Sequence, residues 1–239
     1  NIYNYFMIYV NEKSKSQDDF YFFNFPIMYL LNDKIPPYKL VTHWFDVSSS
    51  KAIEEEYNEF IKLPTQNVVM YQYQTYFSLA HKHFQGKSGI KLIHITGNGE
   101  YNTVLEQLGI DDGTGLGESS LILPYLHDMP KALAATDLAV FRAGAIGLAE
   151  LAVRGIPSIL VPYPYAAEDH QTYNARIFVQ EGAAHMIVDK VLTSHDLIGE
   201  IEMFMANREL LAQMGASALR LGKPNAAHDI AELALSIAK

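Results

Sequence analysis

The chain has 239 residues, a mass of 26.8 kDa and a formal net charge of −9. This acidic balance argues against a nucleic-acid-binding protein, because such proteins carry a basic face that displaces counterions from phosphates. The absence of cysteine excludes disulfides, zinc–thiolate sites and thiol nucleophiles.

The first 80 residues differ in composition from the rest of the chain. They contain none of the 15 glycines and no arginine, but 10 of the 15 tyrosines and 8 of the 12 phenylalanines. The apolar stretch Phe22–Leu31 is interrupted by Asn24 and is too short to cross a bilayer. No cationic segment followed by an apolar one marks a secretory signal, so we expect a cytosolic protein.

Two elements are predicted within residues 1–80. They are a helix around Ser48–Lys62, which Ser50 can cap, and an apolar run at Asn67–Tyr73. A segment without glycine does not easily form a phosphate-binding loop, since such loops need positive φ angles. Two interpretations of this atypical, aromatic-rich N-terminal segment are open: it packs irregularly on the rest of the protein, or it offers an adhesive surface to a partner or membrane.

From about His81 onward, short β-type runs alternate with helical patterns, which predicts a second domain over residues 81–239. Its strands are nearly continuous apolar runs, as expected where helices cover both faces of a parallel sheet. The alternation with short links predicts an α/β fold with a Rossmann-like, doubly wound parallel sheet. The predicted strands and helices are Lys91–Thr96 and Tyr101–Leu108, Ser120–Leu126 and Pro130–Thr136, Leu138–Arg142 and Ile146–Arg154, Ser158–Tyr163 and His170–Glu181, and Ala184–Val188 followed by three helical segments.

Three glycines mark predicted helix ends. Gly109, Gly155 and Gly182 each stand just after a helical pattern. Helices commonly terminate on a residue with positive φ, which glycine adopts without steric penalty. We therefore expect left-handed backbone at these three positions.

Open parallel sheets bind ligands at the carboxyl ends of their strands, and three such junctions carry unusual residues. The first junction, His94–Glu100, runs from a strand into a turn that contains Gly97 and Gly99. These glycines permit a ligand to approach the backbone closely, but an ordinary tight turn explains them equally well.

The second junction, Phe141–Glu150, ends a strand at Arg142 and begins a helix near Ala145. The free amides of the first helical turn, together with the helix dipole, form an anion site suited to a diphosphate. Glu150 lies about one turn further along, where it can accept hydrogen bonds from sugar hydroxyls. A solvated helix charge is an equally good interpretation of Glu150.

The third junction, Val161–Asn174, leaves a buried strand through two prolines. Asp169 can cap the helix that follows, which places His170, Gln171 and Asn174 in its first turns near the ligand edge. Several neutral hydrogen-bonding side chains in one place suit a polyhydroxylated sugar better than a metal. Taken alone, a histidine such as His170 is more often a surface residue than a catalyst.

These blocks resemble a known family. The segments HITGNGEYNTVL, LPYLHDMPKALAATDLAVFRAGAIGLAELAVRGIPSILVPYPYAAEDHQTYNA and GKPNAAHDIAELAL are similar, in order and spacing, to the C-terminal, donor-binding domain of the MurG family. Members of this family transfer N-acetylglucosamine from UDP-N-acetylglucosamine to the lipid-linked muramyl-pentapeptide precursor of peptidoglycan. The resemblance covers roughly residues 81–239. It implies a GT-B-type glycosyltransferase architecture that needs no metal or other cofactor.

The resemblance also implies roles for individual residues. The loop Leu126–Met129 should hold uracil, with the Leu126 backbone reading the edge of the base. Arg142 and the amides of Gly144–Gly147 should face the diphosphate, and Glu150 should take the ribose hydroxyls. The full set of implied donor-binding residues, in which Gln171 and Asn174 hold the N-acetylglucosamine hydroxyls, is Leu126, Met129, Arg142, Gly144, Ala145, Ile146, Gly147, Glu150, His170, Gln171 and Asn174.

The chain departs from the family pattern in several places. Gly147 stands where the family usually has Ser or Thr, so a hydroxyl contact to phosphate is lost, and Tyr165 stands where His is common. The resemblance also implies a glycine-rich loop near the start, whose His is a candidate general base, and a second glycine loop at about Val68–Ala80. Residues 1–80 contain neither, and His43 lies in no motif. The catalytic base is therefore not assigned.

Two functional interpretations follow. In the first, the chain is the donor-binding domain of an inverting N-acetylglucosaminyltransferase in the cytoplasm or at the cytoplasmic face of the inner membrane. UDP leaves with its charge stabilised by the helix N-terminus and Arg142, and a base outside residues 81–239 deprotonates the acceptor. In the second, it is a non-catalytic UDP-sugar-binding module or subunit that needs a partner chain to supply the acceptor site, as in the two-subunit eukaryotic N-acetylglucosaminyltransferase.

A third interpretation concerns residues 1–80 alone. The abrupt shift in composition at their end also fits an artefact of the reading frame. If the second domain is self-contained, a fragment of residues 81–239 is expected to bind UDP by itself.

Overall fold

The computed structural model describes residues 66–71, 77–86, 89–117 and 120–237. They fall into two compact units. The first lies within Ser48–Gly222 and contains the sheet; the second contributes helix α11 (Ala226–Ile237). None of the helices in these residues is long and apolar enough to cross a membrane.

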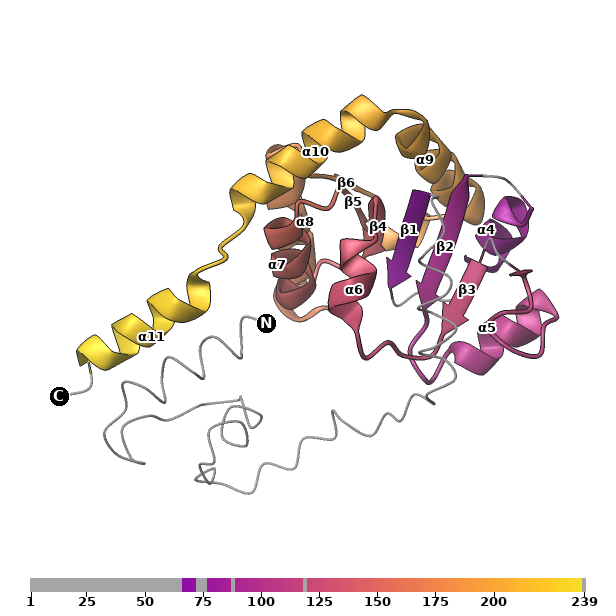
Figure 1. Ribbon diagram of the computed structural model, residues 1–239, viewed down its shortest axis with the longest axis horizontal. Coiled ribbons are helices and arrows are strands. Elements are labelled where there is room, and N and C mark those ends of the chain that lie inside the picture. The colour runs from indigo at the N-terminus through magenta and orange to yellow at the C-terminus, as the bar shows by residue number, and fades with distance from the viewer. Residues whose placement is uncertain (1–65, 72–76, 87–88, 118–119, 238–239) are drawn as a thin grey trace, which may run out of the picture. The chain divides into compact units, whose positions relative to one another are not determined.

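The first unit is built on a parallel sheet with the strand order β3-β2-β1-β4-β5-β6. Every strand pairs in parallel with its neighbours, and the arrowheads of β1, β2 and β3 point the same way in Figure 1. This order is that of doubly wound, dinucleotide-binding folds, so the predicted fold class is confirmed. The strands are β1 (Gln66–Tyr71), β2 (Ile90–Ile95), β3 (Ser120–Leu123), β4 (Leu138–Phe141), β5 (Ser158–Leu160) and β6 (Ala184–Met186).

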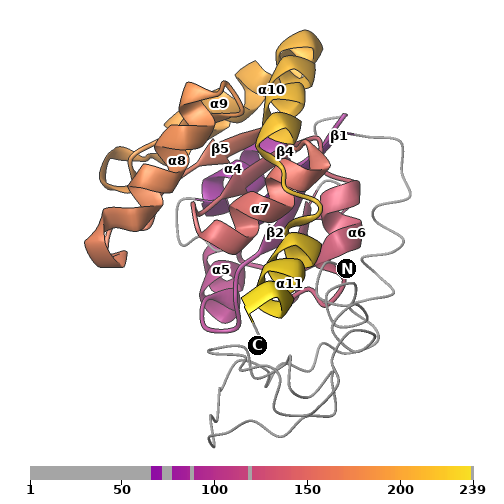
Figure 2. The same cartoon turned by 90° about the vertical axis from the view of Figure 1, so that its left-hand side faces the viewer.

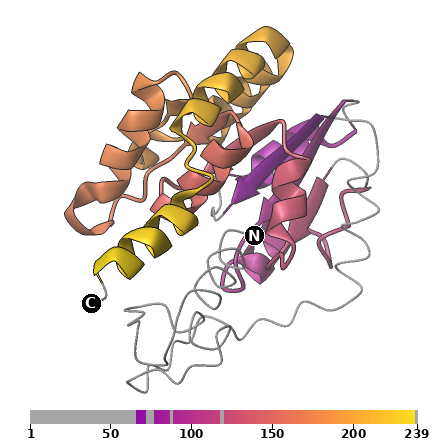
Figure 3. The ribbon, with the colours of Figure 1, turned by 60° about the vertical axis from the view of Figure 1, so that its left-hand side comes forward.

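Helices cover both faces of the sheet. On one face, strand residues such as Ile93 and Phe141 form a core with Leu151 and Phe178 from α7 and α8. Successive strand side chains point to opposite faces, so the neighbouring strand residue Leu92 packs in a second core with α4 and α9. Figure 2 shows α6 and α7 in front of the strands, and Figure 3 shows the layers obliquely. The helices of this unit are α4 (Phe77–Phe84), α5 (Tyr101–Leu108), α6 (Met129–Ala134), α7 (Ala145–Arg154), α8 (His170–Gln180), α9 (Ser194–Ala206) and α10 (Arg208–Leu221).

Three helices end at the glycines predicted to cap them. Gly109, Gly155 and Gly182 have φ angles of 70°, 66° and 71°, so the expected left-handed backbone is confirmed. At the other end of a helix, Thr193 and Asp196 form a capping box that starts α9. Local sequence signals of this kind fix most helix boundaries to within two residues.

Strand β1 belongs to the sheet although it precedes residue 81, where the second domain was predicted to begin. Residues 66–71 pair with β2 along their whole length, and Val68–Met70 also pair with β4. A strand with partners on both sides lies in the interior of the sheet, so residues 66–71 belong to the same sheet as the strands after residue 81. The apolar run predicted at Asn67–Tyr73 is this strand. The helix predicted around Ser48–Lys62 lies outside the described residues.

A buried polar network joins α4 to the sheet. His81 is fully buried; its Nε2 lies 3.0 Å from His94 Nδ1, and its Nδ1 lies 3.0 Å from Ser120 Oγ. The two imidazole rings are stacked with their centroids 5.2 Å apart. Burial, and secondarily the neighbouring His94, hold the pKa of His81 well below its usual value of 6.5.

This network makes the stability of the fold sensitive to acid. A buried histidine with a lowered pKa stays neutral in the folded state, whereas the unfolded chain takes up a proton near pH 6.5. Stability is therefore full above pH 6.5 and falls as the pH drops below it, by up to about 1.4 kcal/mol per pH unit for one proton. Thermal unfolding between pH 7.5 and 5.5 should show this slope in the wild type.

The variant His81→Gln should show a flatter slope over the same range, whatever its absolute stability. The exposed His195 provides the matched control, so His195→Gln should keep the wild-type slope. If the pH dependence is unchanged in His81→Gln, the buried pair does not control it.

Candidate functional site

The predicted site residues gather at one edge of the sheet. Because all strands are parallel, the loops that follow β3, β4 and β5 leave the sheet at the same carboxyl edge. These loops are residues 124–128, 142–144 and 161–169. The structure therefore brings together the second and third junctions and the Leu126–Met129 loop.

The β4–α7 junction has the form of an anion site. Gly144 is the N-cap of α7, with extended backbone, and Ala145 is the first helical residue. The first amides of a helix have no acceptor within that helix, and they carry the positive end of its dipole. No acidic residue occupies the first turn of α7. Ile146, at the second helical position, is 65% exposed, so this turn is open to a ligand.

Gly147 completes the first turn of α7. A Cβ atom added there would lie 3.3 Å from Phe141 Cδ1, a close approach that a small adjustment of the ring can relieve. At Gly144 the same atom would meet nothing within 4 Å. The junction can therefore accept a side chain at either glycine without a clash against backbone.

Glu150 lies on α7, one turn beyond the anion site; the residue is exposed to solvent, while protein atoms partly surround its carboxyl group. Partial burial of the carboxyl raises the pKa of Glu150 above its usual value, although the nearby charge of Arg154 opposes this effect. A partly desolvated carboxylate that keeps solvent access is suited to accepting hydrogen bonds from a ligand.

The Arg142 side chain contacts groups at the ends of the two neighbouring strands, and its predicted role in facing a diphosphate stays a prediction. Its Nη1 donates to Asp189 Oδ2 at 2.5 Å and to the carbonyl oxygens of Val161 and Pro162 at 3.2 and 3.1 Å. The guanidinium carbon lies 5.3 Å from the centre of the Tyr163 ring. Nη1 of Arg142 is thus engaged by a carboxylate and two carbonyls at the ends of neighbouring strands.

The first turns of α8 carry the three predicted polar residues. Gln171 Oε1 accepts a hydrogen bond from the backbone amide of Tyr163 at 3.0 Å. Within the described residues, the side-chain nitrogen of Gln171 remains available to a ligand. Asn174 Nδ2 donates to the Ala143 carbonyl at 3.0 Å. His170 Nδ1 lies 2.7 Å from the Ala167 carbonyl oxygen, so Nδ1 carries a proton and donates it to this oxygen. The other ring nitrogen, Nε2, is then the one that a ligand can contact.

The residue that begins α8 differs in detail from its prediction. Asp169 stands at the N-cap, as expected, but its side chain accepts from Thr172 Oγ1 at 2.6 Å rather than from a backbone amide. Both Glu168 and Asp169 have positive φ, near 50°. Two such non-glycine residues in succession are strained, and this backbone turns the carboxylate of Asp169 away from the usual capping geometry.

The loop before α6 is held at both ends. Leu126 is only 6% exposed and belongs to the core under α6. Asp128 caps α6 by accepting from the Lys131 amide, and its other oxygen lies 2.6 Å from Lys131 Nζ. Tyr125 and His127 stack edge to face, with centroids 4.9 Å apart. These contacts hold the loop in one conformation at the edge of the sheet.

The first junction, His94–Glu100, forms an ordinary tight turn. Gly97 has a φ of 80°, and the buried Thr96 donates through both its amide and its hydroxyl to the Leu123 carbonyl. These bonds tie the ends of β2 and β3 together. A tight turn after β2 therefore accounts for the glycine at position 97 without a ligand.

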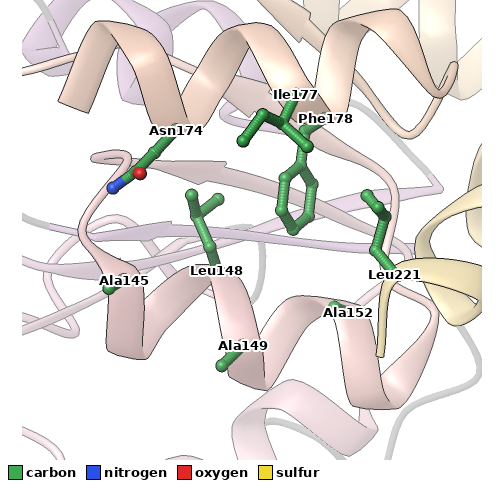
Figure 4. A pocket seen from close by; sticks show the side chains of 8 residues that line it. All are labelled: Ala145, Leu148, Ala149, Ala152, Asn174, Ile177, Phe178 and Leu221. Atoms are coloured by element: carbon green, nitrogen blue, oxygen red, sulfur yellow. The ribbon is translucent and has the colours of Figure 1, made fainter. Parts of the chain in front are cut away.

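A cavity of about 220 Å³ lies between α7 and α8. Figure 4 shows Asn174 and Ala145 at one end of it and Leu221 at the other. Asn174 is the one polar residue in its wall, and the other lining residues are apolar. The cavity therefore forms a hydrophobic groove that begins at the polar edge of the sheet. The lining residues are Ala145, Leu148, Ala149, Ala152, Asn174, Ile177, Phe178 and Leu221.

Sequence reasoning did not identify two members of this edge, Asp189 and Tyr163. Asp189 lies 47 positions beyond Arg142 and follows β6, the last strand of the sheet. The rule that parallel strands end at a common edge applies to β6 as well, so it offered a signal for this residue. For the amide of Tyr163 the sequence holds no comparable signal.

Comparisons with known proteins agree with this architecture. Residues 71–233 match the glycosyltransferase family 28 C-terminal domain. A curated relative from Desulforamulus reducens, a UDP-N-acetylglucosamine–N-acetylmuramyl-(pentapeptide) pyrophosphoryl-undecaprenol N-acetylglucosamine transferase, is 42% identical over 151 residues, covering 62% of this chain and 40% of the relative. A protein of the same name from Halothermothrix orenii is 40% identical over 163 residues, or 66% and 43% of the two chains.

Solved structures share the fold. MurG from Acinetobacter baumannii matches 72% of this chain and 52% of its own, with a TM-score of 0.59 and 24% identity. Os79 from O. sativa, solved with UDP, matches 75% and 44%, with a TM-score of 0.51 and 19% identity. The chain spans about two fifths of the length of the curated relatives it matches.

Proposed function

The chain belongs to glycosyltransferase family 28 through its C-terminal domain, and we propose that it binds UDP-N-acetylglucosamine as the donor half of an N-acetylglucosaminyltransferase. The observation that carries this proposal is the open N-terminus of α7, with Glu150 one turn further along the same helix. A helix N-terminus attracts a diphosphate, and a carboxylate at that distance can take ribose hydroxyls. Both functions are needed for a nucleotide sugar.

The diphosphate is assigned to the first turn of α7. The amides of Ala145, Ile146 and Gly147, together with Gly144, supply donors and the positive end of the helix dipole. Arg142 adds positive charge to this edge but keeps its partners on neighbouring strands. We therefore expect the backbone to contribute more to diphosphate binding than Arg142 does.

The uridine and the sugar are assigned to the flanking loops. The Leu126 backbone and Met129 border the base, and Glu150 takes the two ribose hydroxyls. On the other side, the Gln171 amide nitrogen can donate to a sugar hydroxyl because its oxygen is held by Tyr163. In the same way, the Asn174 oxygen can accept, since its nitrogen is bound to Ala143. His170 offers Nε2 to the same region.

The reaction proposed for the whole enzyme is a displacement at the anomeric carbon. The hydroxyl oxygen of a lipid-linked muramyl-pentapeptide forms the new bond, the bond from the anomeric carbon to UDP breaks, and the hydroxyl proton passes to a base. The charge that develops on UDP is met by the α7 amides. Because the acceptor carries a lipid, we expect this reaction at a membrane surface; the relatives are transferases named for a pyrophosphoryl-undecaprenol acceptor.

Calorimetric titration with UDP and UDP-N-acetylglucosamine, combined with a turnover assay on lipid-linked acceptor, tests this proposal. Binding of both nucleotides with turnover is the expected result for a complete enzyme. Binding without turnover would instead favour a donor-binding module that needs a separate acceptor half. If neither nucleotide binds at millimolar concentration, the donor assignment is wrong.

Gly147 provides a prediction that isolates the diphosphate. A serine at this position adds a hydroxyl to the α7 turn, and the matched variant Gly147→Ala adds the same Cβ, close to Phe141, without the hydroxyl. We expect Gly147→Ser to bind UDP about 3- to 10-fold more tightly than Gly147→Ala, the effect of roughly one added hydrogen bond. Equal affinities in a calorimetric comparison would place the phosphates elsewhere.

A further inference from the structure

The carboxyl ends of three strands are joined through one side chain. Arg142 follows β4, the carbonyls of Val161 and Pro162 follow β5, and Asp189 follows β6. Arg142 Nη1 contacts all three, with the carboxylate closest at 2.5 Å. Since these strands are neighbours in the sheet, the contacts of Arg142 join the loops that follow them at the ligand edge.

The ion pair is partly removed from solvent. The side chains of Arg142 and Asp189 are 18% and 25% exposed. Pairs at the open surface contribute little, but partial burial strengthens the attraction and makes the loss of one partner more serious. By contrast, the pair between Arg208 and Asp137 is 64% and 33% exposed, with a distance of 3.5 Å.

Contacts continue from this pair to the sugar side of the site. The Arg142 guanidinium lies over the ring of Tyr163, whose backbone amide donates to Gln171 Oε1. Tyr163 also meets Tyr165 edge to face, with centroids 5.6 Å apart. A connected path thus runs from Asp189 through Arg142 and Tyr163 to Gln171. Neither the Leu126–Met129 loop nor the first turn of α7 is a member of this path.

We propose that Asp189 is a positioning residue for the sugar: through Arg142 and Tyr163 it sets the orientation of Gln171, which binds the hexose of the donor. The proposal rests on the donor function proposed above. Asp189 itself touches no ligand in this scheme. We expect a larger effect on the sugar than on UDP, because the uridine loop and the α7 amides are not members of the path and Arg142 keeps its charge beside the diphosphate.

The variant Asp189→Asn, made in the full chain, tests this selectivity. Asparagine keeps the size and one acceptor oxygen but removes the charge that holds Arg142. We expect the affinity for UDP-N-acetylglucosamine to fall by about 3- to 10-fold, the equivalent of roughly one hydrogen bond, while the affinity for UDP changes less than twofold. The matched control Asp137→Asn removes the exposed pair with Arg208 and should change neither affinity.

A double-mutant cycle separates positioning from a general structural effect. If Asp189 acts through Gln171, Asp189→Asn should add almost nothing to the loss already caused by Gln171→Ala. The charge-conserving variant Asp189→Glu should recover part of the affinity for the nucleotide sugar, and it supplies the same test if the asparagine variant does not fold.

Each outcome decides the proposal. Selective loss for the nucleotide sugar with non-additivity supports it. Equal weakening of UDP and UDP-N-acetylglucosamine, or losses that add independently to those of Gln171→Ala, overturn it while leaving the donor function intact. A wild-type chain that binds neither nucleotide overturns the donor function, and this proposal with it.

Discussion

Replacement of Glu150 with alanine is expected to weaken UDP binding by about 10- to 100-fold. If its carboxylate accepts hydrogen bonds from both ribose hydroxyls, these bonds are charge-assisted and contribute about 1.5–3 kcal/mol, and about 1.4 kcal/mol corresponds to a tenfold change in affinity. Calorimetric titration of wild type and variant measures the difference. Stability should change little, because alanine is the better helix former and Glu150 is not in the core.

Two control variants define the cause of the loss. Glu150→Gln keeps one acceptor oxygen without the charge, so its affinity should fall between those of wild type and Glu150→Ala. Glu209 is an exposed glutamate in the first turn of α10, and Glu209→Ala should bind UDP as wild type does. A solvated helix charge at position 150 would give less than a twofold change in either Glu150 variant.

The ligand provides a second control on the same contact. Wild type should bind 2′-deoxy-UDP more weakly than UDP, because one acceptor bond of Glu150 is lost. Glu150→Ala should bind the two nucleotides equally. If the variant still distinguishes them, another residue recognises the ribose.

The sequence predicted the α/β alternation because most of its signals are local. The helix at Tyr101–Leu108 was predicted with the observed bounds, and the expected start of α8 at His170 agrees with the structure. Apolar runs marked the buried strands, while Gly109 and Gly155 marked helix ends. Each of these signals depends on a few neighbouring residues, which is why it can be read without knowledge of the fold.

The sequence analysis did not place the central strand β1 in the sheet, and this omission has a physical cause. Its residues belong to the first 80 residues, which contain no glycine. Because the composition changes after residue 80, the domain boundary was predicted there. Membership of a sheet is decided by pairing with β2 and β4, whose register partners begin at Ile90 and Leu138. Such distant pairing leaves little trace in the local sequence.

The sequence predicted that the candidate residues share one edge of the sheet, but it did not predict their contacts with one another. The junctions of β4 and β5 lie at one edge, as the rule for parallel sheets requires. The partner of Arg142 was not predicted, because Asp189 is distant in sequence and an arginine near an anion site is readily assigned to the anion. Only the geometry shows that a carboxylate and two carbonyls already occupy Nη1.

A chain that begins at residue 81 is expected not to fold and therefore not to bind UDP. This expectation reverses the one drawn from the sequence alone. It would lose β1, and β2 and β4 would each lose a neighbour in the middle of the sheet. Their backbone groups would then be unpaired in the interior, at a cost of about 1–3 kcal/mol for each buried group left unsatisfied. Several such groups exceed the net stability of about 5–15 kcal/mol typical of a domain.

A chain that begins at Ser48, the start of the compact unit, is the matched comparison and should keep a cooperative thermal transition and UDP binding.

Within the full chain, Val69→Pro tests the contribution of β1 by a single substitution. Val69 pairs with Ile93 on one side and Ala139 on the other, and proline removes an amide from a strand that has no free edge. We expect a loss of about 3 kcal/mol or more in unfolding free energy, measured by denaturant titration. A cooperative transition with UDP binding in the chain from residue 81 would mean that the sheet closes without β1, since no other described strand lies between β2 and β4.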